Sequence, residues 1–307
     1  ILDFFVMSFE KEEPVPIFVK PEDLHLYKSV KFVDVRSPTD YAEGHLNNAV
    51  NMYDIFTYLL PTSTEEAINK MNNHFQTRFS ELGITGQEHI IIYEQSMNNQ
   101  YGASCRGFFI FKHMRHPHVS TLEGGLDAMI RFEGSTQAIT KEAPVIIPCQ
   151  YHGNDDNTFD SWMASRDNVL RVLNNRISGT WLVDVRDAVE WLGLSSSPYG
   201  VDFTPRKGRI PRSVWIEWHK FHKLDNEKHV AKSKSNEQIQ ALMTAYGIQS
   251  DDEIIIYCFK GSRAAVALMK LKEAGYSNVK NYFASWNEWS RDFQLPIDDK
   301  ILVGNKE

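Results

Sequence analysis

The sequence predicts an α/β protein of two similar domains, each an open parallel sheet with helices on both faces. Three observations indicate this fold. Landmarks in the first half of the chain return in the same order in the second half. Each half contains a short, continuously apolar run typical of a strand that is buried on both faces. The length of 307 residues, with 42% hydrophobic and 24% charged residues, suits two globular domains.

The repeat consists of four landmarks. They are an apolar run ending in Asp-Val-Arg, a segment that begins with glycine, an Ile-Ile-Ile-Tyr run preceded by a glycine turn, and a final strand-to-helix segment. The matched pairs are 32–36 with 182–186, 44–49 with 208–213, 82–93 with 246–257, and 119–129 with 279–289. Four matches in one order indicate a tandem duplication.

In the second half the elements are expected in the order helix, strand, loop, helix. Ser235 and Gln238 form a predicted capping box at the start of the first helix, and Gly247 ends it. The strand covers 254–257. In the helix after the loop, apolar residues recur at spacings of four and three and Gly275 ends the pattern, the repeated positions being Ala264, Leu268 and Leu271. Function is expected at the carboxyl ends of such strands.

A linker is expected between the repeats. Residues 133–160 include two prolines, a glycine and the polar run 154–157. We therefore expect a first domain over 14–140, a linker over 141–160 and a second domain over 161–307. The acidic run lacks the ligand spacing of a calcium loop, so it predicts no metal site.

Charge and cysteine content narrow the partners. A net charge of −7 gives no general attraction for nucleic acid or an anionic membrane, and a small anion in a local basic pocket remains compatible with it. The apolar runs are too short to span a bilayer. Three cysteines are too few for a disulfide framework and indicate a reducing compartment. We expect the cytoplasm, with the mitochondrion left open.

The strand at 254–257 leads directly into the loop Cys258-Phe259-Lys260-Gly261-Ser262-Arg263. The cysteine therefore follows a strand and precedes a helix N-terminus, where free N–H groups favour negative charge. Lys260 and Arg263 are expected to add positive charge, and Gly261 lets the loop turn its amides toward the sulfur. These features predict that Cys258 is a nucleophilic thiolate. Cys105 and Cys149 are expected to be ordinary small side chains.

Further residues are candidates for the site or for the structure. Arg186 either lines the substrate site or holds a loop through Asp184, and the same choice applies to Arg36 with Asp34. Arg209 is a candidate for positive potential at the mouth of the pocket, and Trp286 for its wall or for the core. Three histidines lack the spacing of a metal site and are expected in a loop after a helix, at positions 113, 116 and 118.

With these motifs the chain resembles the two-domain rhodanese sulfurtransferases, which include thiosulfate and 3-mercaptopyruvate sulfurtransferases. The resemblance extends from about residue 14 to 296 and is carried by the Asp-Val-Arg strands, the segments at 44–46 and 208–210, the loop 258–263 and the run 284–289. It implies that Cys258 takes a sulfane sulfur from a small anionic donor and passes it to cyanide, a small thiol or a protein thiol. No metal or organic cofactor is implied.

The sequence also departs from the family pattern. Two-domain members commonly have a second arginine four residues after that of Asp-x-Arg, and here this position is Glu190. The ending Ser262-Arg263 resembles single-domain members more closely. In the first domain Glu94 takes the place of the cysteine and the following loop is about four residues longer. We therefore expect the first domain to be catalytically silent.

Two other functions are compatible with parts of this sequence. A cysteine phosphatase needs five residues between cysteine and arginine, whereas this loop has four, and the smaller ring suits one sulfur better than a phosphoryl group. An idle rhodanese-like binding module is the other alternative, although such modules have usually lost the cysteine. Lys260 favours thiosulfate as the donor because a loop lysine can stabilise the departing sulfite, and 3-mercaptopyruvate is the second choice.

Overall fold

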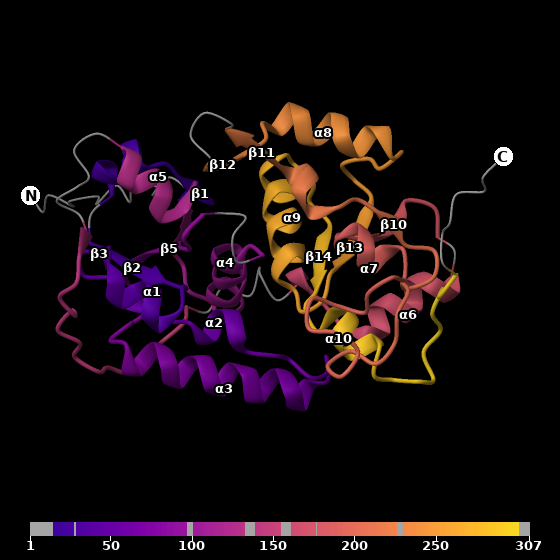
Figure 1. Cartoon of the computed structure of the whole chain (residues 1–307), viewed down its shortest axis with the longest axis horizontal. Helices are drawn as coiled ribbons and strands as arrows, with labels where there is room; N and C mark the ends of the chain where they lie inside the picture. The colour runs from indigo at the N-terminus through magenta and orange to yellow at the C-terminus, as the bar shows by residue number, and fades with distance from the viewer. Residues whose placement is uncertain are drawn as a thin grey trace, which may run out of the picture.

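A computed structural model describes residues 15–27, 29–96, 101–132, 139–154, 161–175, 177–225 and 230–300. Two α/β domains lie side by side in it (Figure 1). Within the described residues each domain has a five-stranded sheet in which all neighbouring strands are parallel. The fold predicted from the sequence is confirmed.

The two sheets have the same strand order. The first runs β1 (Phe18–Val19), β6 (Val119–Leu122), β5 (His89–Tyr93), β2 (Val30–Asp34), β4 (Val50–Asn51). The second runs β8 (Met163–Ala164), β14 (Val279–Tyr282), β13 (Glu253–Tyr257), β9 (Thr180–Asp184), β10 (Val214–Trp215). Each strand of one sheet has a counterpart in the other, which confirms the duplication.

Helices surround both sheets. Those of the first domain are η1 (Pro21–Leu26), α1 (Pro38–Glu43), α2 (Asp54–Thr57), α3 (Glu65–Glu81), α4 (Ala103–His113) and α5 (Gly125–Arg131). Those of the second are α6 (Arg166–Asn175), α7 (Ala188–Trp191), η4 (Trp218–Phe221), α8 (Asn236–Ala245), α9 (Ser262–Glu273) and α10 (Ser285–Trp289). In the described ranges, no helix has the length and apolar character that crossing a membrane would require.

Side chains of β5 show why its sequence is continuously apolar. Ile91 packs in a cluster with Leu126 of α5, whereas Ile90 and Ile92 belong to the cluster that contains Phe108 of α4. Successive side chains of a strand point to opposite faces, so a strand covered by helices on both faces needs an apolar residue at every position.

The predicted helix boundaries in the second domain are confirmed. α8 starts at a capping box. The side chain of Ser235 accepts the backbone N–H of Gln238, and the side chain of Gln238 accepts the backbone N–H of Ser235. Gly247 and Gly275 follow α8 and α9 in the left-handed region, with φ of 78° and 94°.

Part of the segment expected as a linker contacts the first domain. β7 (Ile139–Thr140) pairs antiparallel with β3 (His45–Leu46), and the chain after it continues along the first domain. Tyr151 is buried against Phe79, and its hydroxyl donates to the carbonyl oxygen of Met114. The segment around Tyr151 therefore packs against the first domain. The acidic positions 155 and 156 lie outside the described residues.

The domains meet along α4 and α9, which lie next to each other between the two sheets (Figure 1). Phe109 of α4 stacks on Phe283, with ring centroids 5.1 Å apart. Gly102 immediately precedes α4 with φ of 74°, and a Cβ atom there would lie 2.2 Å from Cγ2 of Val266 on α9. A side chain at residue 102 would therefore collide with α9 at this approach.

Gly102→Ala is expected to weaken this interface. Alanine costs about 1 kcal/mol in the left-handed region, and the clash with Val266 should add roughly 1 to 3 kcal/mol. Gly275→Ala is the matched control, since Gly275 also has positive φ but a Cβ atom there would meet nothing within 4 Å. Urea denaturation should show a larger loss of unfolding free energy for Gly102→Ala, and equal losses would contradict this account.

Candidate functional site

Cys258 lies at the carboxyl end of β13, directly before the loop that leads into α9. Only 1% of the residue is exposed. Its backbone N–H donates to Oγ of Ser285 over 3.1 Å, and its carbonyl oxygen accepts the N–H of Trp286 over 3.1 Å. The segment 284–289 therefore fixes the backbone of the cysteine, which gives that sequence motif a structural role.

The turn after the cysteine depends on Gly261. This residue has φ of 84°, and a Cβ atom there would lie 2.5 Å from Cδ2 of Phe283. Its N–H donates to Sγ of Cys258 over 3.2 Å, while its carbonyl oxygen accepts Nδ2 of Asn281 over 3.0 Å. The loop thus directs one backbone N–H at the sulfur, where it stabilises negative charge.

Lys260 extends from the loop to the first domain. Its ammonium group lies 4.0 Å from the ring centroid of Phe56 and donates to the Phe56 carbonyl oxygen and to the hydroxyl of Tyr199. Burial and the positive charge of Arg106 lower the pKa of Lys260 to about 7, and the thiolate of Cys258 opposes this shift. No carboxylate among the described residues pairs with this lysine.

Arg263 is compensated within the second domain. Its guanidinium donates to both carboxylate oxygens of Glu190, over 2.6 and 3.1 Å, and also pairs with Asp187 over 3.1 Å. Arg263 and Glu190 are both almost fully buried. Arg263 was expected to add positive charge near the cysteine. It does line the cavity beside Cys258, but Glu190 and Asp187 compensate its charge.

A small cavity lies beside Cys258. It has a volume of about 10 Å³, which is room for about one water molecule. The loop side chains Phe259, Lys260, Ser262 and Arg263 line it together with Tyr101 of the first domain and Pro198 and Tyr199 of the second. The hydroxyl of Ser262 is buried and has no hydrogen-bond partner in the described part of the chain. The sulfur of Cys258 therefore adjoins a small space bounded by aromatic, cationic and hydroxyl side chains.

The residues at 101, 198 and 199 were not singled out from the sequence. For residues 198 and 199, the sequence does contain a signal, which is a difference in spacing between the two repeats. Arg36 and Gly44 are 8 residues apart in the first repeat, whereas Arg186 and Gly208 are 22 apart in the second. The second repeat thus has an insertion, and this insertion carries Tyr199 to the cavity. Its ring packs 5.1 Å from that of Phe259.

Three other predicted site residues do not line this cavity. Arg186 is buried and donates hydrogen bonds to the carboxylate of Asp184 and to the Gly208 carbonyl oxygen. Its guanidinium carbon lies 4.6 Å from the ring centroid of Trp286. Trp286 is itself buried, and its indole N–H donates to the carbonyl oxygen of Arg206. Arg209 forms an ion pair of 2.7 Å with Asp298. Arg209 was a candidate for the mouth of the pocket, but its side chain instead contacts Asp298 near the end of the described chain.

The first domain keeps a related framework around Glu94. Its carboxylate is buried and accepts the N–H and the hydroxyl of Ser104 over 3.2 and 2.6 Å. Arg36 donates hydrogen bonds to Asp34 in the same way as Arg186 does to Asp184. Residues 97–100 of the longer loop lie outside the described residues.

The two other cysteines lie away from the cavity at Cys258. Cys105 on α4 is fully buried, which raises the pKa of its thiol, and Cys149 is partly exposed.

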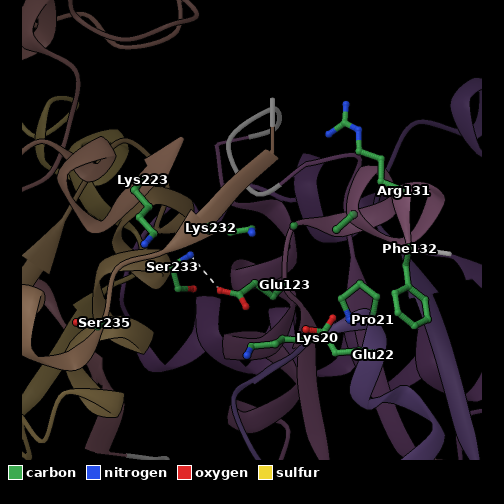
Figure 2. A pocket seen from close by; sticks show the side chains of 12 residues that line it. Lys20, Pro21, Glu22, Glu123, Arg131, Phe132, Lys223, Lys232, Ser233 and Ser235 are labelled. Atoms are coloured by element: carbon green, nitrogen blue, oxygen red, sulfur yellow. Dashed lines mark hydrogen bonds between the residues drawn. The ribbon is translucent and has the colours of Figure 1, made fainter. Parts of the chain in front are cut away.

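A second, larger groove lies between the domains and is shown in Figure 2. Its volume is about 720 Å³, and its lining carries both lysines and glutamates. Ser233 donates its N–H to Glu123 across it over 3.0 Å. None of the three cysteines lines this groove. It therefore lacks the nucleophile that the cavity at Cys258 possesses.

The chain matches the family model of the rhodanese-like domain twice, over residues 22–131 and 169–292. It is 28% identical to a Saccharopolyspora erythraea protein named "Putative thiosulfate sulfurtransferase", over 88% of this chain and 90% of that protein. It is 32% identical to the sulfur carrier protein TtuD of Thermus thermophilus, over 73% of this chain and 75% of that protein.

Among solved structures, the fold is similar to the anaerobic ergothioneine biosynthesis enzyme from Chlorobium limicola in complex with trimethyl histidine. The TM-score is 0.73 at 20% identity, over 95% of this chain and 66% of that enzyme. At this identity the likeness concerns the fold.

Glu190→Gln tests the neutralisation of Arg263. The substitution leaves a buried guanidinium with Asp187 as its remaining carboxylate partner, and losing one member of a buried pair costs about 3 kcal/mol. Glu253→Gln is the control, since Glu253 pairs with Arg171 and Lys280 at a more exposed position and should lose at most about 1 kcal/mol. Urea denaturation distinguishes the two. An unchanged stability of Glu190→Gln would show that the pair is not important.

Proposed function

The chain belongs to the rhodanese family, and on that basis we propose that it transfers sulfur from thiosulfate to a thiophilic acceptor through a persulfide on Cys258. The observation that carries this proposal is the environment of the Cys258 sulfur. Sγ accepts the Gly261 N–H at the N-terminus of α9, and the ammonium group of Lys260 lies in the same loop without a carboxylate partner among the described residues. A thiolate and an anionic donor are both stabilised by such a site.

The reaction takes two displacement steps. The thiolate of Cys258 attacks the outer sulfur of thiosulfate, and the S–S bond of the donor breaks so that sulfite leaves with the electron pair. Cys258 then carries a persulfide anion. Cyanide or a thiolate attacks the outer sulfur of that persulfide, which releases thiocyanate or a new persulfide and restores the Cys258 thiolate. No external oxidant or reductant is consumed.

Lys260 supports thiosulfate as the donor. Negative charge concentrates on the departing sulfite as the donor bond breaks, and a loop cation stabilises that charge in the transition state. A 3-mercaptopyruvate donor would instead need a carboxylate site, and Glu190 stands where the family commonly has an arginine. Because Glu190 also occupies Arg263, neither residue offers a free cation to a carboxylate. 3-Mercaptopyruvate therefore remains the second choice.

A protein thiol is a suitable acceptor besides cyanide. The relative from Thermus thermophilus is named a sulfur carrier protein, which supports transfer from one protein sulfur to another. The alternative of an idle binding module is less well supported. Such a module has no need for a buried cysteine with a backbone N–H directed at its sulfur.

Cys258→Ser is expected to abolish thiocyanate formation from thiosulfate and cyanide, because serine cannot form a persulfide. Cys105→Ser and Cys149→Ser are the matched controls and should retain activity within about threefold, since neither cysteine lines the cavity. A continuous thiocyanate assay on the three variants measures this. Full activity of Cys258→Ser would refute the proposal.

The role of Lys260 predicts a pH dependence. Because its pKa is lowered to about 7, the ammonium group is charged below that pH and loses its proton as the pH rises. We expect kcat/KM for thiosulfate to fall from about pH 7 to pH 9, toward the value of Lys260→Ser, which should be roughly 10² lower than wild type at neutral pH.

Lys260→Arg is the control for this pH profile, since a guanidinium stays charged throughout the range. Its kcat/KM should lack the alkaline decline, whatever its absolute value. A wild-type profile that rises steadily to pH 9 would contradict a role for the ammonium charge.

A further inference from the structure

Arg106, on α4 of the first domain, is a fully buried cation. Its Nη1 donates to the carbonyl oxygens of Ile55 and Phe56 over 3.0 and 3.1 Å. Its Nε and Nη2 have no hydrogen-bond partner within the described residues, and none of the described carboxylates forms an ion pair with it. Buried polar groups without partners are rare in proteins and call for an explanation.

The two nitrogens that are unpaired in Arg106, Nε and Nη2, bind a carboxylate in two other arginines of this chain. Nε and Nη2 of Arg186 donate to the carboxylate of Asp184 over 3.0 and 2.6 Å. Arg36 holds Asp34 with the same two nitrogens. This edge of a guanidinium matches two oxygens of one anion. In Arg106 it is free of protein partners in the described structure, although the residue is equally buried.

The local structure compensates only part of this charge. The guanidinium lies over the ring of Phe283 at 4.7 Å, a contact that contributes about 0.5 to 2 kcal/mol. Leaving an ionised group in the interior without a counter-ion costs several kcal/mol. A bound anion would compensate this charge.

Arg106 is adjacent to the proposed reaction site. Lys260, which lines the cavity at Cys258, donates to the same Phe56 carbonyl oxygen as Arg106. Phe283, which stacks on Arg106, also contacts Gly261 of the loop. Burial lowers the pKa of Arg106 to about 10, and negative charge on Cys258 acts against this. The two cations therefore lie close together, held by one carbonyl oxygen, and Lys260 lines the cavity beside the cysteine.

We propose that Arg106 binds the oxyanion end of the sulfur donor, so that the first domain supplies a substrate-binding cation to the site of the second. This inference rests on the proposed sulfur transfer. The ligand class is an anion with at least two terminal oxygens, such as the sulfonate of thiosulfate or a carboxylate. Arg106 supplies the free positive charge that Arg263 lacks because of Glu190.

The first test measures binding without turnover. In the Cys258→Ser background, thiosulfate is titrated by calorimetry into protein that carries Arg106→Met or Lys112→Met. Lys112 is the matched control, since it is another buried cation of α4 and its ammonium group bonds to the carbonyl oxygen of Pro117. Arg106→Met should weaken the Kd at least about tenfold and Lys112→Met less than about threefold. An unchanged Kd in Arg106→Met overturns the proposal.

Arg106→Lys provides a second variant in case the methionine variant does not fold. It keeps the charge but loses the two-nitrogen edge, so we expect a Kd between those of wild type and Arg106→Met. Sulfite and pyruvate are titrated as separate probes of sulfonate and carboxylate. The probe whose Kd depends on Arg106 identifies the oxyanion, and independence of both overturns the proposal.

These outcomes are separable from a failure of the proposed function. Wild-type protein that binds thiosulfate through Arg106 but forms no thiocyanate would refute sulfur transfer alone. Active wild-type protein whose thiosulfate affinity and kcat/KM are unaffected by Arg106→Met would refute the role of Arg106 alone.

Discussion

The close packing of α4 against α9 is the contact on which the rest of the site depends. It is possible because Gly102 has no side chain, and it brings the first domain against the start of α9, where the Cys258 loop ends. As a result Tyr101 lines the cavity beside the cysteine, and Lys260 extends to Phe56. The first domain, in which Glu94 takes the place of the loop cysteine, thereby forms one wall of the second domain's site.

Burial at this interface determines which charges act on Cys258. Arg263 is ion-paired with Glu190, so its charge is compensated before any ligand binds. Lys260 and Arg106 have no carboxylate partner in the described residues and donate to one shared carbonyl oxygen. Two like charges in a low-dielectric environment repel each other, and a bound dianion relieves that repulsion. With Arg263 paired to Glu190, Lys260 and Arg106 are the two cations near Cys258 that keep no carboxylate partner among the described residues.

The sequence predicted those features that depend on neighbouring residues or on repetition. The parallel sheets, the cap of α8 and the loop at Cys258 all follow from contiguous patterns that occur in order. Contacts between distant segments were not predictable in this way. Glu190 lies 73 residues before Arg263, and Asp298 lies 89 residues after Arg209, so their ion pairs have no local signal. Tyr151 anchored a segment that its composition marked as a linker, and the unpaired edge of Arg106 appears only in three dimensions.

The central claim is that Cys258 carries the transferred sulfur as a persulfide. Mass spectrometry of protein incubated with thiosulfate, without an acceptor, tests it most directly. The account predicts that the intact mass increases by one sulfur atom, that this sulfur is found on the peptide containing Cys258, and that cyanide removes it as thiocyanate. Sulfur bound instead to Cys105 or Cys149, or no added sulfur at all, would contradict the account.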